Sequence, residues 1–186
     1  MEIKLETERL KIRSITKKDL KFILEIELRP ETNEYESMDT PDEDYLTERF
    51  NWFLENAENL PNGGGVRFIV QKGTKKIGDM SLVCTWEDTQ EWELGFSFLS
   101  EYWGNGYASE SVRAIAQLAF EELGIHKLVM NINADNVRST KLAEKLGFVK
   151  ESHLREARLY NGKWNDETMY AMLRCDYDKM IKNVKP

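Results

Sequence analysis

A glycine-containing junction, Trp103-Gly104-Asn105-Gly106-Tyr107-Ala108, constrains the fold of this chain more than any other segment. It follows a stretch with the alternation of a strand, 91–99, and leads directly into a stretch with helical periodicity, 112–123. Glycine reaches positive φ without steric cost, and the first amides of a helix have no partner within it. The junction therefore predicts a strand-to-helix turn whose backbone amides can bind an anion such as phosphate.

The two flanks of the junction support this interpretation. Alternation across 91–99 predicts a strand with one apolar face in the core and one polar face, made of Glu91, Glu93, Gly95 and Ser97. Downstream, the helical pattern ends at Gly124, which predicts a C-terminal cap. Within the strand, Gly95 predicts a bulge that separates this strand from a neighbour.

Two well-known phosphate-binding patterns do not fit the junction. No Gly-Lys-Ser/Thr ending is present, so the lysine and hydroxyl of a nucleoside-triphosphate loop are missing. Position 109 is Ser where a dinucleotide fold has its third glycine, and the preceding strand is half polar. A short Gly-x-Gly by itself also fits an ordinary turn, so both interpretations stay open at this stage.

Length and charge limit the classes of protein to which the chain can belong. Its 186 residues fit one domain, 1–186, with a sizeable core. A net charge of −7 argues against nucleic acid as the main partner. No apolar run reaches the length of a membrane span, and the first residues do not resemble a secretory leader, so we expect a cytoplasmic protein without a membrane partner.

The order of elements predicts one α/β (α+β) domain with a mixed sheet. The pattern predicts strands over 8–14, 66–71, 76–86, 91–99 and 128–132. A capping box of Thr16 and Asp19 opens a helix to Leu28, and Thr40-Pro41-Asp42-Glu43 opens a second helix with Pro at its first position. A short helix over 136–146 precedes a hairpin that turns at Asn161-Gly162.

Acidic residues are concentrated between Glu25 and Glu48, where the chain carries ten of them and one basic residue, Arg29. One interpretation is a solvated helix face with N-terminal caps. The other is a negatively charged lobe that attracts a cationic acceptor. The sequence favours neither.

Six segments together resemble the GNAT acyltransferase superfamily, and within it the RimJ/RimL type of ribosomal-protein N-terminal amino-acid acetyltransferases. Their order and spacing make the resemblance specific over nearly the whole chain. The segments are Thr7–Arg13, Glu93–Phe96, Tyr102–Glu110, Asn136–Ser139, Glu144–Phe148 and Asn161–Asp166.

The resemblance implies a single GNAT domain, with a strongly twisted central sheet flanked by helices, that transfers an acetyl group from acetyl-CoA to a primary amine without a metal. Trp103 departs from the Gln or Arg that usually opens the family's loop. By this resemblance, the coenzyme A contacts are expected from Phe98, Leu99, Trp103, Gly104, Asn105, Gly106, Tyr107, Ala108, Ser109 and Asn136.

Candidate catalytic residues follow from the chemistry of amines, which are mostly protonated at neutral pH and must lose a proton before attack. Glu93, on the polar face of the strand, is the first candidate base and Glu91 the second, although both also fit a solvated strand face. Much of the superfamily has a tyrosine acid where this chain has Ala143. Ser139, or a water held by Asn136, would then protonate the leaving thiolate, and Asn136 also suits an N-cap.

Three functions remain in competition. The leading one is acetylation of the N-terminal α-amine of a peptide or ribosomal protein. The second is acetylation of a small polycation, such as a polyamine or an aminoglycoside, which the acidic segment would suit. The third is a non-catalytic CoA-binding module, which the alanine at position 143 makes conceivable. The acceptor and the oligomeric state are not determined, and a homodimer is one alternative.

Overall fold

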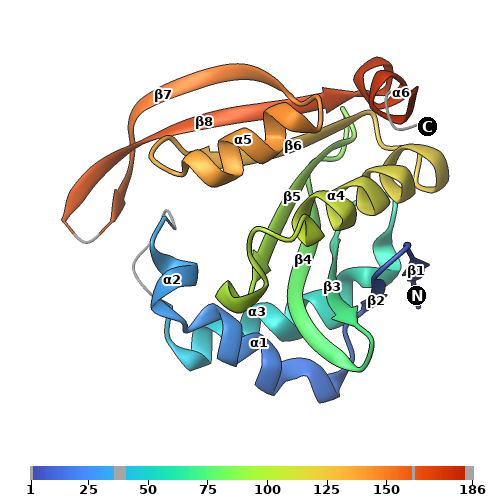
Figure 1. Ribbon diagram of the computed structural model, residues 1–186, viewed down its shortest axis with the longest axis vertical. Helices are drawn as coiled ribbons and strands as arrows, with labels where there is room; N and C mark the ends of the chain where they lie inside the picture. The colour runs from blue at the N-terminus through green and yellow to red at the C-terminus, as the bar shows by residue number, and fades with distance from the viewer. Residues whose placement is uncertain (1, 36–40, 161, 183–186) are drawn as a thin grey trace.

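The computed structural model describes residues 2–35, 41–160 and 162–182 and contains one eight-stranded sheet (Figure 1). The strand order is β1-β2-β3-β4-β5-β6-β8-β7, and β5 and β6 pair parallel whereas the other neighbours pair antiparallel. The mixed sheet expected from the sequence is therefore confirmed. The strands are β1 (Lys4–Glu6), β2 (Lys11–Ser14), β3 (Gly65–Lys72), β4 (Lys75–Trp86), β5 (Glu91–Phe98), β6 (Lys127–Asn133), β7 (Val149–Tyr160) and β8 (Lys163–Leu173).

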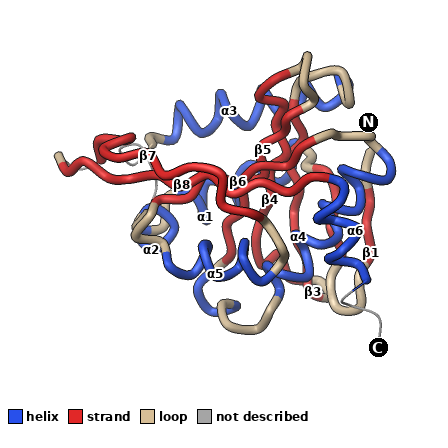
Figure 2. Tube along the Cα trace, turned by 90° about the horizontal axis from the view of Figure 1, so that it is seen from above, coloured by secondary structure: helices blue, strands red, loops and turns tan. Residues whose placement is uncertain are grey.

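Helices lie on both sides of the sheet, with α3 on the side opposite α4 and α5 (Figure 2). A π-helical turn, Leu118–Glu122, continues α4. Short 3₁₀ turns precede α1, follow α3 and follow β5, at Lys17–Asp19, Ala57–Asn59 and Ser100–Tyr102. The helices are α1 (Leu20–Glu27), α2 (Pro30–Asn33), α3 (Glu43–Asn56), α4 (Tyr107–Gln117), α5 (Val137–Lys145) and α6 (Arg174–Lys182).

Each face of the sheet has its own hydrophobic core. The larger core includes Trp92 of β5 and Ile115 of α4, and the smaller one includes Ile23 of α1 and Phe50 of α3. Successive residues of a strand point to opposite faces, so β5 places its apolar residues in the larger core. Its polar residues face the side of α1 and α3, as the alternation predicts.

Most predicted helix ends are confirmed, because they depend on local chemistry. The capping box at Thr16 is present, and Gly124 and Gly147 have φ of 67° and 86° just after their helices. The second helix begins later than expected, at Glu43. Asp42 is its N-cap and accepts a hydrogen bond from a main-chain amide at 2.8 Å, so the proline precedes the cap instead of occupying the first helical position.

Several strands and helices differ from those expected from the sequence. The strand expected over 8–14 is shorter, β2, and pairs with an unpredicted strand, β1. The helices α2 and α6 were also not predicted from the sequence pattern. The hairpin pairs β7 with β8 as expected; its turn residue Asn161 and the Thr40 of the second helix lie outside the described residues.

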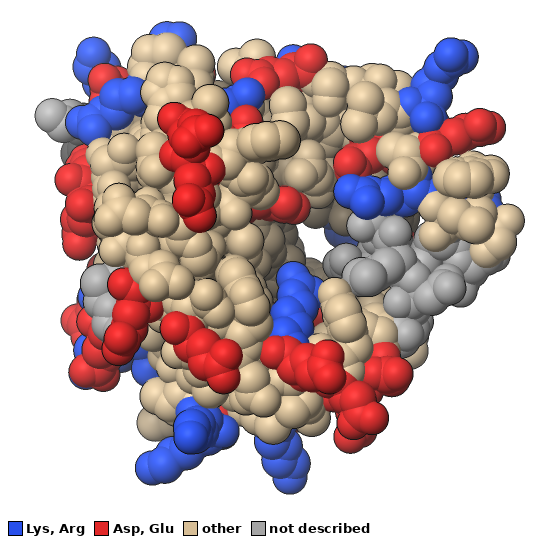
Figure 3. Space-filling model, turned by 180° about the vertical axis from the view of Figure 1, so that it is seen from behind, with Lys and Arg blue, Asp and Glu red and all other residues tan. Residues whose placement is uncertain are grey.

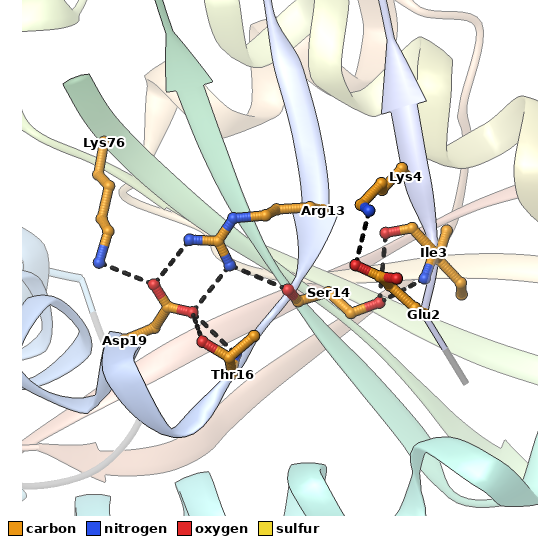
Figure 4. Close-up of polar contacts among 8 residues, drawn as sticks. All are labelled: Glu2, Ile3, Lys4, Arg13, Ser14, Thr16, Asp19 and Lys76. Atoms are coloured by element: carbon orange, nitrogen blue, oxygen red, sulfur yellow. Dashed lines mark hydrogen bonds and ion pairs between the residues drawn. The ribbon is translucent and has the colours of Figure 1, made fainter. Parts of the chain in front are cut away.

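A buried carboxylate fixes the start of α1 against the sheet (Figure 4). Arg13 of β2 donates two hydrogen bonds to Asp19, each 2.8 Å, and the Lys76 ammonium lies 2.7 Å from the same carboxylate. The amide and hydroxyl of Thr16 donate to it as well. Burial by itself would raise the pKa of Asp19, but these hydrogen bonds outweigh it and hold the pKa well below its usual range. One side chain thus joins β2, β4 and α1.

We expect Asp19→Asn to destabilise the fold and to change its response to acid. Asp19 is only 1% exposed, and loss of hydrogen bonds to charged partners costs about 2 kcal/mol or more. Because the folded-state pKa lies below the unfolded value of about 3.8, the carboxylate stabilises the fold fully above about pH 5 and progressively less below about pH 4. Urea unfolding at several pH values measures both effects.

The exposed residue Asp88 in the β4–β5 turn provides the control. Asp88→Asn removes the same charge and should leave the stability at neutral pH and its acid dependence nearly unchanged. Equal stability of the Asp19→Asn and Asp88→Asn variants at neutral pH would contradict this role of Asp19.

Candidate functional site

A pocket of about 490 Å³ lies at the carboxyl end of β5, between the β5–α4 loop, α2 and α5. Its lining residues come from three segments that are far apart in the sequence, 31–35, 96–109 and 136–145. Figure 1 shows α2, the β5–α4 loop and α5, to which these segments belong. The lining combines aromatic rings of β5 and the loop with basic side chains of α5 and polar side chains of α2. An apolar pocket with a few converging polar groups is typical of a ligand site.

The pocket lies where two strands separate. β4 pairs with β5 from Glu91 to Phe98, but β6 pairs with β5 at only three positions, Glu91, Trp92 and Glu93. Beyond Glu93, within the described residues, the edge of β5 that faces β6 has no strand partner. Backbone groups in a protein interior need hydrogen-bond partners, so this edge is suited to an extended ligand with amide groups.

The strand separation expected beside Gly95 is present, because the pairing of β5 with β6 ends at Glu93, but Gly95 causes no register shift against β4. It pairs in regular register with Ser81 of β4, and the strand separation lies on the other side of β5. A Cβ at position 95 would lie 2.8 Å from the Ser81 hydroxyl oxygen. A side chain at position 95 would therefore require the Ser81 hydroxyl to move, and glycine avoids this contact.

The glycine junction has the backbone expected of it. Gly104 and Gly106 have φ of 74° and 78°, in the left-handed region that favours glycine, and Gly106 is the N-cap of α4. Arg9 anchors the loop from the N-terminal segment: it donates to the Asn105 carbonyl at 3.1 Å and to the Glu110 carboxylate at 2.7 Å. The junction is thus a strand-to-helix turn, and no side chain of the described residues caps the first amides of α4, which are suited to an anion.

The structure brings together most of the residues expected to bind the cofactor. Leu99 is an exception, because it is buried in the core with α1 and α3. Asn105 is a second exception: its side-chain amide donates to the carbonyls of Tyr102 and Trp103, and it does not line the pocket. The predicted residues that do line the pocket are Phe98, Trp103, Gly104, Gly106, Tyr107, Ala108, Ser109, Asn136 and Ser139.

Sequence reasoning missed the basic side of the pocket. Arg138, Lys141 and Lys145 all line it from α5. Their spacing of three and four residues places them on one helix face, so the pattern could have been recognised. The contribution of Glu31 in α2 and of Tyr35 in the turn after it had no such signal, because α2 is only four residues long.

Glu93 does not line the pocket but lies on the same strand. It shares a face of β5 with the pocket residue Ser97, four residues or about 13 Å along the strand. Burial raises the pKa of the Glu93 carboxyl, and the negative charge of Glu167 adds to this effect. A hydrogen bond from Asn131 and the charge of Arg49 oppose it without cancelling it. A carboxylate with a raised pKa is suited to proton transfer.

The second candidate base has another partner. Glu91 lies 3.4 Å from the Lys127 ammonium, and it also accepts a hydrogen bond from Thr85. The Lys127 ammonium and the Thr85 hydroxyl thus contact the two carboxylate oxygens of Glu91. These contacts favour Glu93 over Glu91.

The helix α5 explains the alanine at position 143. Ala143 is completely buried in the larger core, so its side chain faces the protein interior. Asn136 caps the same helix by accepting a hydrogen bond from the Ser139 amide at 3.1 Å, as expected from the sequence. Both Asn136 and Ser139 also line the pocket, so capping does not remove them from the site.

Part of the acidic segment is paired with arginine. Arg29 lies 3.2 Å from Glu25, and Arg138 lies 3.1 Å from Glu34. The buried Arg67 pairs with Glu27. On the face of the molecule seen in Figure 3, acidic and basic side chains lie next to one another. Glu36 and Asp39, which belong to the same segment, lie outside the described residues.

Residues 2–35, 41–160 and 162–182 contain neither a candidate metal site nor a candidate membrane-spanning helix. No group of three or more His, Cys, Asp or Glu side chains in these ranges could hold a metal ion. No helix there has both the length and the apolar composition to cross a membrane.

A family model and a curated relative both describe acetyltransferases. Residues 9–149 match the model of the acetyltransferase (GNAT) domain family. An uncharacterized N-acetyltransferase of Bacillus subtilis (strain 168), YoaA, is 27% identical over 172 residues, which cover 91% of this chain and 96% of that protein.

Two solved structures have a similar fold. A spermidine N-acetyltransferase from Vibrio cholerae, in complex with CoA and spermine, superposes with a TM-score of 0.80 at 24% identity and covers 92% of this chain and 99% of its own. A ribosomal-protein-S5-alanine acetyltransferase from Vibrio fischeri gives a TM-score of 0.81 at 23% identity, over 94% and 98% of the two chains.

We expect the Glu93 carboxyl to titrate above its ordinary value of 4.5 and Asn131→Ala to raise its pKa further, because the hydrogen bond that stabilises the carboxylate is lost. Carbon-detected NMR of the glutamate carboxyl groups measures this pKa directly. Asn133→Ala on the same strand is the control, because the Asn133 side chain accepts from Asp135 instead. A Glu93 pKa at or below 4.5 in the unmodified protein would contradict this description of the site.

Proposed function

The chain belongs to the acetyltransferase (GNAT) domain family, and on this basis we propose that it transfers the acetyl group of acetyl-CoA to a primary amine with Glu93 as the general base. One observation carries the proposal: β5 holds a desolvated carboxylate at Glu93, has no strand partner on its β6 side beyond that residue within the described part of the chain, and leads to a left-handed glycine turn at the start of α4.

The residues present fit coenzyme A. The left-handed Gly104 and Gly106 leave the loop without Cβ atoms where its amides would bind the diphosphate. The free edge of β5 beyond Glu93 would pair with the amides of the pantetheine arm, and the aromatic ring of Phe98 lines the same pocket. When bound, acetyl-CoA supplies a thioester whose carbonyl carbon accepts the amine nitrogen.

Glu93 would remove the proton of the attacking amine. A primary amine is mostly protonated near neutral pH, so a base must remove its proton. A base is most effective when its pKa lies close to the working pH. Desolvation raises the pKa of Glu93 in that direction. Arg49 and Arg158 lie near enough to limit the rise, so the carboxyl still ionises.

The leaving thiolate needs a proton as well. Ser139 lines the pocket from the first turn of α5, and the Asn136 side chain holds its amide in place. We assign protonation of the thiolate to the Ser139 hydroxyl or to a water bound by Asn136. Because water can replace a hydroxyl in this role, Ser139→Ala should reduce kcat only modestly.

The leading acceptor is the α-amine at the N-terminus of a peptide or ribosomal protein. An α-amine has a pKa of about 8, more than two units below that of a lysine-like amine, so a carboxylate base deprotonates it more readily. The arginine partners of Glu25, Glu27 and Glu34 also leave fewer free carboxylates for a polycation than the sequence suggests.

A polyamine is the second candidate acceptor. Its support is the fold shared with the spermidine N-acetyltransferase, whose structure contains spermine. A polycation would need several free carboxylates near Glu93. Glu167 is a nearby carboxylate, but it is paired with Arg158 at 3.3 Å. Acetylation of an α-amine needs only a single base.

Turnover with a panel of acceptors tests the proposed function. Release of free thiol from acetyl-CoA should require an acceptor with a primary amine, and peptides with a free N-terminus should react faster than the same peptides with a blocked one. Faster turnover of spermidine than of every peptide would establish the second candidate. No thiol release with any amine, although CoA binds, would contradict both.

The role of Glu93 predicts the effect of Glu93→Gln. This change keeps the shape of the side chain but removes the base, so kcat should fall by about a hundredfold or more while the affinity for CoA stays the same. The unmodified enzyme should lose activity as the pH falls through the raised pKa of Glu93, and the variant should not show this limb.

Glu91→Gln is the matched control, because it removes a carboxylate two residues away that contacts Lys127. Its kcat should change little. A large loss in Glu91→Gln together with full activity in Glu93→Gln would show that the base has been assigned to the wrong residue.

The cofactor loop predicts the effect of Gly106→Val. Gly106 has a φ of 78°, so valine strains the turn and displaces amides that would bind the diphosphate. Loss of such charge-assisted hydrogen bonds should weaken CoA binding about tenfold or more in calorimetry. Gly124→Val introduces similar strain at a φ of 67° outside the pocket and should leave CoA affinity unchanged. Equal CoA affinities of the two variants would contradict the assignment.

A further inference from the structure

We propose that Arg138 is a phosphate-binding residue for coenzyme A whose ion pair with Glu34 is exchanged for the ribose 3′-phosphate when the cofactor binds. The inference rests on the proposed function, because it takes coenzyme A as the ligand of the pocket. It adds a residue on α5, Arg138, that selects ligands with a 3′-phosphate, and a carboxylate beside α2, Glu34, that competes with this phosphate for Arg138.

Arg138 is held at the pocket by three contacts from two other segments. Its guanidinium carbon lies 4.1 Å from the centre of the Trp103 ring and 5.8 Å from that of the Tyr35 ring. Its Nη2 lies 3.1 Å from a carboxylate oxygen of Glu34. All three side chains of this aromatic and basic group, Arg138, Trp103 and Tyr35, line the pocket, whereas Glu34 does not.

The same helix face carries further positive charge. Lys141 and Lys145 line the pocket beside Arg138, and within the described part of the chain neither lysine forms an ion pair. The acidic side chain among the lining residues is Glu31, which accepts a hydrogen bond from Ser100 at 2.9 Å and lies 3.7 Å from Arg29. In a chain with a net charge of −7, this pocket therefore has a local excess of positive charge.

Coenzyme A supplies the matching anion. Besides the diphosphate, which we assign to the loop amides, it carries a phosphate on the ribose, which is largely a dianion at neutral pH. A planar guanidinium binds phosphate through two parallel hydrogen bonds, and the adjacent lysines add charge without a geometric requirement.

The present partner of Arg138 is easily replaced. The side chains of Arg138 and Glu34 are 55% and 51% exposed, and ion pairs at such exposure contribute about 0–1 kcal/mol. A phosphate with two charges and three oxygens is the stronger partner. Trp103 keeps the guanidinium at the pocket during the exchange, which reduces the ordering cost of binding.

If the 3′-phosphate replaces Glu34 as the partner of Arg138, Glu34 should affect cofactor affinity. An ion pair that plays no part in binding would not have this effect. Glu34 competes with the cofactor for Arg138, so removal of its charge should strengthen cofactor binding. The effect should depend on the 3′-phosphate and on Arg138, because both are partners in the exchange.

Calorimetric binding of CoA and dephospho-CoA, which lacks the 3′-phosphate, tests the inference. Arg138→Met should weaken CoA binding about tenfold and leave dephospho-CoA binding unchanged. Glu34→Gln should strengthen CoA binding by about two- to fivefold, also without effect on dephospho-CoA. In the Arg138→Met background, Glu34→Gln should have no effect. Lys150→Met, which removes a charge from an exposed position on β7, is the control and should change neither affinity.

Three results would overturn the inference. One is equal affinity of the unmodified protein for CoA and dephospho-CoA, and another is an equal loss of both affinities in Arg138→Met. The third is a Glu34→Gln effect that persists without Arg138. Each of these leaves acetyl transfer intact, whereas failure of the unmodified protein to bind CoA at all would overturn both this inference and the proposed function.

Discussion

The early end of the pairing between β5 and β6 is the constraint on which the rest of the site depends. The two strands are paired for three residues, up to Glu93, and then separate. A sheet paired along its whole length would have no free backbone edge and no space for a pocket at residues 96–98. Because the β5–α4 loop follows directly, the free edge and the anion-binding amides of the loop are continuous.

Long-range ion pairs hold the walls of this opening in position. Asp19 binds the start of α1 to β2 and β4, and Arg67 of β3 holds the end of α1 through Glu27. Arg138 then links α5 to the segment after α2 through Glu34. The first two contacts are largely buried and structural. The third is half exposed and therefore weak, which suits a contact that a ligand replaces.

Features that depend on residues close together in the sequence could be predicted, and features that depend on distant residues could not. The glycine turn, the Thr16 capping box and the Asn136 cap depend on residues within a few positions, and the sequence was sufficient for them. The strand separation beside Gly95 was expected, but the side of β5 on which it occurs depends on how β4 and β6 pair with β5, and β6 is distant in the sequence. The acidic segment could not be judged at all from composition, since the pair of Glu34 and Arg138 spans 104 positions.

Amide hydrogen exchange along β5, measured by NMR with and without CoA, tests the central claim most directly. In the free protein, amides of residues 94–98 that point away from β4 should exchange faster than those of residues 91–93, which lie between two paired strands. Coenzyme A should protect these fast amides while leaving residues 91–93 unchanged. Uniform protection of β5 in the free protein, or CoA binding that leaves residues 94–98 unprotected, would contradict the account.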